Sequence, residues 1–351
     1  MTHALQRFII RTLVALIPVY ALVALYVVSD PFKVVHPYKG LYSNGDTVTL
    51  TVNNGYISTR NFLRFKDAMH YDSFIFGSSL SKYFTAKAWL KHLPKGSSVY
   101  HYDQNGETLW GIYNKINFIN KNGIQVKHAL IVIEEEMLRR DESTIKDRFL
   151  YMQDYKTTPQ FDCLNFHLQF FNMFKNPEFI KYELDKTDNV HRMLALQYAT
   201  TDIPNRIERT NEEYYATFDS LIAHAPTKFF TPERMAKRKL HALPMAYNNS
   251  IDAHTQDILI KIKQLLSQNH TDYTIIIPPR FYRRTLPEYD LYTLKRIFGD
   301  THVFDFSHDT TISQNPRNYY DDAAHLISSK CAMLLDSAYF LQSHTIQSPY
   351  F

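Results

Sequence analysis

The stretch DSFIFGSSLS, residues 72–81, decides the fold that the sequence predicts. Its apolar run Phe74–Phe76 is typical of a buried strand, and Gly77 permits the tight turn that ends such a strand. Two serines follow, and residues 82–90 can continue as a helix. A strand–turn–helix corner of this kind places a serine hydroxyl at the carboxyl edge of a parallel sheet, where α/β folds bind their ligands. The simpler alternative is that the two serines only cap the helix.

Apolar runs and helical patterns alternate along much of the chain after this corner. Such alternation predicts right-handed strand–helix–strand crossovers, and therefore an α/β fold with a flavodoxin-like parallel sheet covered by helices on both faces. The expected strands are residues 72–76, 97–102, 129–133, 273–277 and 302–306, and the expected helices are residues 82–90, 108–120, 251–268 and 323–341.

Residues 137–249 interrupt this rhythm with polar and aromatic sequence that is helical only in places. Insertions at the carboxyl edge of a sheet usually form caps or partner surfaces. The basic cluster at residues 234–239 is either a solvated helix face or part of such a surface. We therefore expect an α/β domain over residues 71–351 that carries this helical insertion, preceded by a polar juxtamembrane stalk over residues 31–70.

Residues 12–29 form an almost unbroken apolar run, just long enough to cross a bilayer as one helix. Arg7 and Arg11 precede the run, which predicts a cytoplasmic tip, a single span within residues 1–30, and a periplasmic or other extracytoplasmic domain anchored in the inner membrane. A cleaved signal peptide is the alternative, but the length of the run and the missing small-residue cleavage motif favour an uncleaved signal-anchor. Pro18 should kink the helix without breaking it.

The composition excludes several classes of function. The chain has 351 residues and a formal net charge of +4, and its basic clusters are too short to indicate nucleic-acid binding. Its two cysteines exclude a disulfide scaffold and a zinc ribbon, although a disulfide between Cys163 and Cys331 stays possible. No zinc-ligand spacing and no phosphate-binding glycine loop is present, so we expect neither a metal nor a cofactor.

A second chemical motif, YDDAAHL at residues 320–326, follows the last expected strand. A serine becomes nucleophilic when a histidine removes its proton, and a carboxylate can hold that histidine in the correct tautomer. Asp322 and His325 supply both groups in one turn, with Asp321 as the alternative acid. The sheet should bring this loop to the same edge as Ser79. The competing interpretation is that Asp322 caps the terminal helix and that His325 is a surface residue.

These motifs together resemble the SGNH-type, or GDSL-like, hydrolases. The segment GSSL at residues 77–80 is similar to the Gly-Asp-Ser-Leu block of that family, with Ser78 in place of the aspartate. DAAH at residues 322–325 is similar to the last block, and Asn105-Gly106 to the block that contributes to the oxyanion hole. The third-strand block, normally Gly-x-Asn, is missing, because the chain there reads Ile133 followed by three glutamates.

The resemblance implies a role for each matched residue. Ser79 would be the nucleophile, His325 the base and Asp322 the acid. The oxyanion hole would be formed at Ser79 and at Asn105-Gly106, without the usual asparagine donor. Outside the matched motifs, Glu134 and Arg280 follow strands at the same expected sheet edge. Glu134 could orient a substrate hydroxyl or pair with Arg280, and Glu134–Glu136 could equally be a solvated loop start. Arg280 could bind a phosphate or acidic glycan, or only hold the insertion.

One membrane-anchored subgroup of this superfamily is similar in further features: an N-terminal membrane helix, Gly-Ser-Ser after the first strand and a late Tyr-x-Asp-x-x-His-Leu. It includes the lipoteichoic acid D-alanylation protein and other partners of membrane-bound O-acyltransferases. This resemblance implies a serine-dependent acyltransferase or esterase of the cell envelope. Its partners would be a membrane-bound O-acyltransferase, an acylated carrier or envelope glycan as substrate, and the lipid bilayer at residues 12–29. The alternative is a catalytically idle scaffold that recruits the acyltransferase.

Overall fold

The computed structural model describes residues 3–38, 48–140, 148–158, 163–201, 203–236, 249–281, 285–320 and 324–346. The chain divides into two compact units. The first unit consists of Met1–Asn53 with Pro159–Ile203, and the second of Asn54–Thr158 with Pro204–Phe351. Each unit is therefore built from two separate stretches of sequence.

The second unit is organised around a five-stranded parallel sheet, as the sequence predicts. The spatial order β3-β2-β4-β8-β9 is the order 2-1-3-4-5 along the chain, which is that of flavodoxin-like sheets. Gly77 pairs with Val132, and Val132 with Ile276, so the carboxyl ends of the three central strands lie side by side. The strands are β2 (Ser73–Gly77), β3 (Val99–His101), β4 (His128–Val132), β8 (Asp272–Ile277) and β9 (Val303–Asp305).

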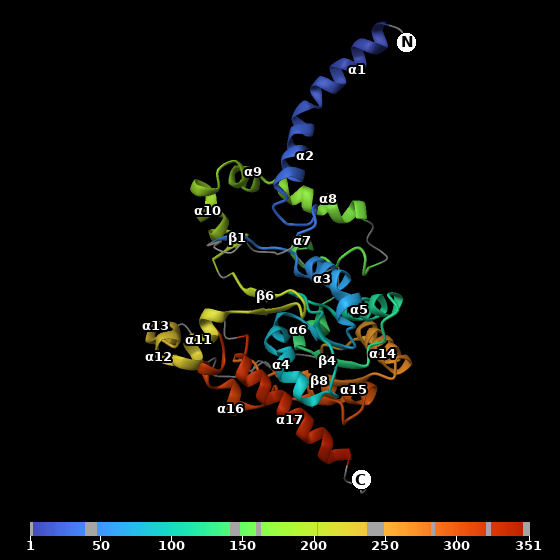
Figure 1. Cartoon of the computed structure of the whole chain (residues 1–351), viewed down its shortest axis with the longest axis vertical. Helices are drawn as coiled ribbons and strands as arrows, with labels where there is room; N and C mark the ends of the chain where they lie inside the picture. The colour runs from blue at the N-terminus through green and yellow to red at the C-terminus, as the bar shows by residue number, and fades with distance from the viewer. Residues whose placement is uncertain are drawn as a thin grey trace. The chain divides into compact units, whose positions relative to one another are not determined.

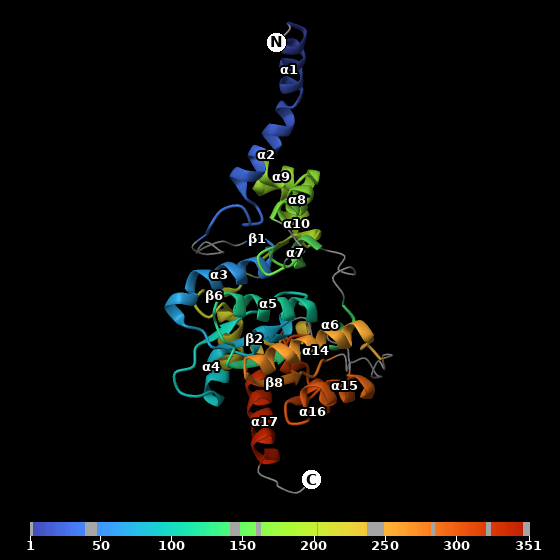
Figure 2. The ribbon, with the colours of Figure 1, turned by 90° about the vertical axis from the view of Figure 1, so that its right-hand side faces the viewer.

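Helices cover both faces of this sheet (Figure 1 and Figure 2). Strand side chains alternate between two cores, because successive residues of a strand point to opposite faces. Phe74 and Phe76 belong to one core, whereas Ile75 belongs to the other. The first core is covered by α3 (Asn54–Met69), α5 (Leu109–Lys121), α14 (Ala253–Gln268) and α15 (Glu288–Phe298), and the second by α4 (Ala86–Trp89) and α17 (Ser328–Ile346).

Shorter elements connect these layers or extend them. They are η1 (Ser79–Tyr83), η2 (Leu90–His92), α6 (Glu135–Arg139), α7 (Arg148–Tyr151), β6 (Asn205–Ile207), β7 (Glu212–Tyr214), α11 (Ala216–His224), α12 (Pro226–Phe229), α13 (Pro232–Ala236), α16 (Thr310–Ser313) and η3 (Pro316–Asn318). The helix expected over residues 82–90 is split because Thr85 begins a new one, its hydroxyl accepting a hydrogen bond from the N–H of Ala88.

The first unit contains the apolar N-terminal segment. Among the helices that the structure describes, no single one has the length and apolar character to cross a membrane, whereas α1 and α2 meet that test together and are bent by 44° at their junction. Pro18 lies in the first turn of α2, where its missing N–H is tolerated, so the bend agrees with the expected kink. The elements of this unit are α1 (His3–Ala15), α2 (Ile17–Ser29), β1 (Thr49–Leu50), α8 (Cys163–Phe174), α9 (Pro177–Leu184), α10 (Lys186–Ala195) and β5 (Ala199–Thr200).

Two expected boundaries differ from this organisation. Residues 54–69 are not part of a polar stalk but form α3 of the second unit, because residues such as Ile57 and Phe62 give that helix a buried face. Residues 137–249 do not form one inserted body. Residues 159–203 belong to the first unit, where β5 pairs with β1, while residues 204–236 return to the second unit. Cys163 and Cys331 lie in different units and are both free thiols.

Candidate active site

The end of β2 forms a tight corner that depends on Gly77. A Cβ atom there would lie 2.9 Å from the carbonyl oxygen of Val132 and 2.8 Å from the Cβ of Ser81, so a larger residue would force the two strands or η1 apart. Ser78 caps η1, because its Oγ accepts a hydrogen bond from the backbone N–H two residues further on. The capping interpretation is therefore confirmed for Ser78. Ser79 is the first residue of η1 and its side chain is half-buried.

His325 meets Ser79 at this corner. The Nε2 atom of His325 lies 2.8 Å from the Oγ atom of Ser79, although 246 residues separate them in sequence. When the other ring nitrogen carries the proton, Nε2 accepts the hydrogen bond from the serine O–H and can remove its proton. His325 precedes α17, which begins at Ser328 and not at residue 323 as expected. The histidine lies instead in a segment fixed by a bridge between Tyr319 and Leu326.

Aromatic side chains hold the histidine segment in place. The ring of Tyr83, from η1, meets the ring of His325 edge-on, with centroids 5.7 Å apart, and packs against Tyr320 at 4.5 Å. The Tyr320 hydroxyl donates to the carboxylate of Asp219 on α11 and lies 3.2 Å from the Oγ of Ser328. Burial raises the pKa of Asp219, and the hydrogen bond from Tyr320 opposes that rise. Sequence reasoning missed these supports, because Asp219 is 101 residues from Tyr320 and no motif links them.

The structure describes only some of the other residues predicted for the catalytic group. Asp322 and its alternative Asp321 lie outside the described residues, so the acid of the group stays a prediction. Asn105 and Gly106 form a turn after β3, with Gly106 at φ +63°, a conformation that favours glycine. The N–H of Gln104, the residue before this turn, donates to the carbonyl oxygen of Gly77 at 3.2 Å. The turn therefore lies at the same sheet edge as the serine corner, and its oxyanion role stays a prediction.

The end of β4 is charged and buried. Glu134 is 6% exposed, and its Oε2 lies 3.5 Å from Nη1 of Arg280, which follows the neighbouring strand β8. The same Arg280 nitrogen lies 3.4 Å from Glu136, and Arg140 lies 3.1 Å from Glu136. The expected pairing of Glu134 with Arg280 is confirmed, and the interpretation of Glu134 as the start of a solvated loop is wrong. Arg283 and Arg284, which follow Arg280, lie outside the described residues.

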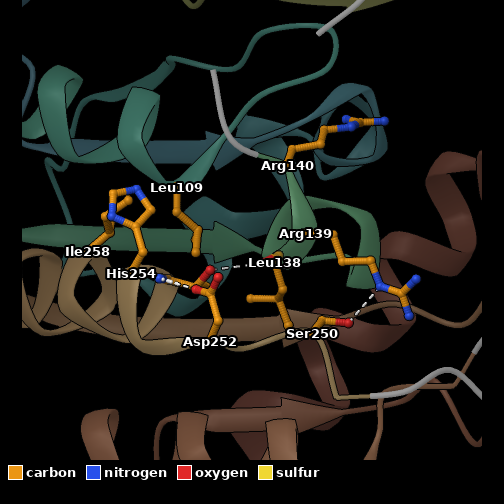
Figure 3. Close-up of a pocket in the computed structure, with 9 residues that line it drawn as sticks. Leu109, Leu138, Arg139, Arg140, Ser250, Asp252, His254 and Ile258 are labelled. Carbon is orange, nitrogen blue, oxygen red and sulfur yellow. Dashed lines mark hydrogen bonds between the residues drawn. The ribbon is translucent and has the colours of Figure 1, made fainter. Parts of the chain in front are cut away.

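A pocket of about 90 Å³ opens beside this charged cluster (Figure 3). The guanidinium of Arg139 points to Ser250 there, at 2.9 Å, and pairs with Glu135 at 2.5 Å, so its charge is compensated by protein groups. None of Ser79, His325, Gly106, Glu134 and Arg280 lines this pocket. Its lining residues are Leu109, Leu138, Arg139, Arg140, Ser250, Asp252, His254, Thr255 and Ile258. In the part of the chain that the structure describes, no group of three or more His, Cys, Asp or Glu side chains could hold a metal ion.

Comparisons with known proteins do not identify a family for this chain. No protein family matches the sequence, and no curated protein matches it either.

Proposed function

We propose that this chain is a membrane-anchored, extracytoplasmic serine acyltransferase or esterase of the SGNH-like type, which acts in O-acylation of a cell-envelope polymer such as by D-alanylation or acetylation. The observation that carries the proposal is the 2.8 Å contact between Ser79 Oγ and His325 Nε2 at the carboxyl edge of a parallel sheet. This edge is where such folds place their ligands.

The chemistry proceeds in two transfers. His325 Nε2 takes the proton of the Ser79 hydroxyl while the serine oxygen attacks the acyl carbonyl, and the resulting oxyanion accepts hydrogen bonds from the backbone N–H groups of Ser79 and Gly106. The imidazolium then protonates the leaving group, and the acyl group stays on Ser79. In the second transfer His325 removes a proton from the acceptor hydroxyl, or from water, which attacks the acyl-serine and releases Ser79 with its proton restored. Asp322 would orient the imidazole.

A specific observation favours a second candidate function. The Gly-x-Asn block that supplies an asparagine donor after the third strand of the resembled family is missing, and β4 is followed instead by Glu134, a buried carboxylate paired with Arg280. A carboxylate cannot donate to an oxyanion unless it is protonated. The second candidate is therefore an idle scaffold that recruits a membrane-bound O-acyltransferase.

A fluorophosphonate probe on the full chain separates the two functions. The wild-type chain should become labelled, and Ser79→Ala should lose labelling by at least about 10³-fold, as expected for removal of a catalytic nucleophile. Ser78→Ala and Ser81→Ala are matched controls from the same corner and should keep the label. Labelling that persists in Ser79→Ala would show that the assigned nucleophile is wrong. An unlabelled wild-type chain, together with intact envelope modification in Ser79→Ala cells, would support the scaffold.

The proposed topology has an independent test. We propose that residues 12–29 span the membrane with Arg7 and Arg11 on the cytoplasmic side, because arginines flank the N-terminal end of the run. A reporter that is active only in the oxidising periplasm, fused after Phe351, should be active. If only a reporter that requires the cytoplasm is active, the topology is wrong whatever the labelling experiment shows.

A further inference from the structure

Helix α8 of the first unit packs against the exit of the apolar N-terminal segment. The ring of Tyr26, near the end of α2, lies 5.5 Å from that of Phe171 and 5.3 Å from that of Phe174, centroid to centroid. Phe32, just beyond α2, lies 5.5 Å from Phe170 in the same way. These rings are held within one unit, so α8 and the end of α2 form a common body (Figure 1).

The surface of α8 that this packing leaves exposed is divided lengthwise. Leu164, Leu168 and Phe171 are spaced by four and three residues and therefore share one flank of the helix. Asn165, Gln169 and Asn172 have the same spacing one position later and share the next flank. Leu164 is 68% exposed and Leu168 43% exposed. We call these the apolar flank and the polar flank.

The apolar flank continues the apolar surface of α2. Phe171 belongs to this flank and also contacts Tyr26 of α2. The last turn of α2 is itself exposed and apolar, with Val28 81% exposed. Lys175, one turn beyond Phe171, has its ammonium over the Phe171 ring, 6.0 Å from the ring centroid, which is a cation–π contact at the end of the flank.

We infer that α8 is an interfacial helix, whose apolar flank lies in the headgroup region of the bilayer that α1 and α2 enter. The inference depends on the proposed membrane anchoring. A lipid surface fits better than a protein groove, because the flank is continuous with α2 and ends in a lysine, and because helices of this kind lie in the membrane plane with one apolar side. Cys163, which begins α8, would then lie at the membrane surface.

Site-specific fluorescence on the full chain tests this position. Cys163→Ser removes the exposed thiol, and Cys331 is buried, which raises its pKa and makes it inert to labelling. Single cysteines at Leu168→Cys and Gln169→Cys then carry an environment-sensitive fluorophore on the apolar and the polar flank. Both positions are exposed, so neither substitution disturbs packing. The chain is reconstituted into phosphatidylcholine–phosphatidylglycerol vesicles that contain lipids spin-labelled near the acyl carboxyl end.

We expect quenching at least about twofold stronger at position 168 than at position 169, since an interfacial helix buries its apolar side about 5–10 Å into the headgroup and acyl boundary. Equal quenching at both positions overturns the inference. So does a probe at 168 that is protected from aqueous iodide but not quenched by lipid, which would indicate a protein partner or a second copy.

A third probe, at Val23→Cys in α2, tests the membrane anchor separately from the interfacial position of α8. Lipids that are spin-labelled deep in the acyl chain report on position 23. Strong quenching at position 23 without quenching at position 168 would reject the interfacial helix and support the membrane anchor. No quenching at 23 rejects the anchor and the interfacial helix with it.

Discussion

Two buried carboxylates of the second unit, Glu213 and Asp154, have pKa values shifted in opposite directions. Glu213, on β7, pairs with Lys82 of η1 and with Arg206 of β6. Asp154 lies in the segment that follows α7, and its Oδ2 is 3.8 Å from Nε of Arg60. Burial raises the pKa of both groups, but the two cations beside Glu213 bring its pKa down to about 2, whereas that of Asp154 rises to about 6.

Both carboxylates are buried, so the difference between their pKa values follows from how closely the cations approach. Lys82 and Arg206 both hydrogen-bond to Glu213, whereas Arg60 lies 3.8 Å from Asp154 without a hydrogen bond to it. Lys82 lies three residues beyond Ser79 in η1, so the ion pair ties Glu213 to the element that begins with Ser79. The segment with Asp154 begins near the turn at Asn105-Gly106, since the ring of Tyr151, three residues before Asp154, lies against Gly106. Glu213 therefore stabilises the fold above a pH of about 4.5, and this stabilisation is lost as the pH falls towards 2. Ionisation of Asp154 instead lowers the stability of the fold as the pH rises towards 6.

The largest expected loss of stability comes from removing the ion pair between Lys82 and Glu213. Lys82→Met leaves Glu213 buried with Arg206 alone, and loss of one partner from a buried ion pair costs about 3–5 kcal/mol. Urea unfolding of the full chain at pH 7, followed by tryptophan fluorescence, measures this cost. Lys87→Met is the matched control, because Lys87 is exposed on the neighbouring helix α4. Equal unfolding free energies of the two variants would show that the Lys82 pair contributes no stability.

The next effect is the dependence of stability on pH that Asp154 causes. The folded pKa of Asp154, about 6, is above its ordinary value of 3.8, so the folded state binds more protons between these values and stability falls as the pH rises through them. The difference corresponds to about 3 kcal/mol. Asp154→Asn should remove this dependence, because the side-chain oxygen that accepts from the N–H of Lys156 is kept.

Unfolding free energies of wild type and Asp154→Asn at several pH values between 3.5 and 7 provide the measurement. The unfolding free energy of the variant should increase relative to that of the wild type as the pH rises, so that the variant is the more stable protein at pH 7. Asp300→Asn, with an exposed carboxyl, serves as the control and should follow the wild type. A constant difference between wild type and Asp154→Asn across the range would contradict the raised pKa.

The sequence predicted the sheet well because its strands are short apolar runs, and such runs can be recognised locally. The meeting of Ser79 with His325 was also predictable, since a parallel sheet brings successive strand ends to one edge. Helix α3 was missed because Asn53-Asn54-Gly55 has the composition of a turn, and the burial of Phe62 is supplied by residues far along the chain. The ion pairs of Glu213 and Asp154 were missed for the same reason, because charged residues are usually solvated and only tertiary packing buries them.

Asp219 is an intermediate case, half-buried and hydrogen-bonded to the Tyr320 hydroxyl. Tyr320→Phe should cost about 1.5–3 kcal/mol of unfolding free energy, as for other hydrogen bonds to a charged group. It should also slow fluorophosphonate labelling of Ser79, because Tyr320 packs on Tyr83, which contacts His325. Tyr289→Phe, at an exposed position, is the control for both measurements. An unchanged labelling rate in Tyr320→Phe would show that the Asp219 contact does not position the histidine.

The smallest expected effect is that of Ser78→Ala. This variant tests whether the corner at Ser79 is held by the Lys82–Glu213 ion pair or by the Ser78 cap. The Ser78 Oγ atom accepts the N–H of Leu80 at 3.3 Å, a long hydrogen bond, and loss of an N-cap side chain costs about 0.5–2 kcal/mol. Ser78→Ala should fall at the low end of that range, because the hydrogen bond from the Ser81 hydroxyl to the Ser78 carbonyl oxygen, at 2.7 Å, is kept. The urea experiment used for Lys82→Met measures both variants on one scale. If Ser78→Ala cost as much as Lys82→Met, the cap would stabilise the corner as strongly as the Glu213 pair does, and the ion pair alone would not explain how Ser79 is positioned.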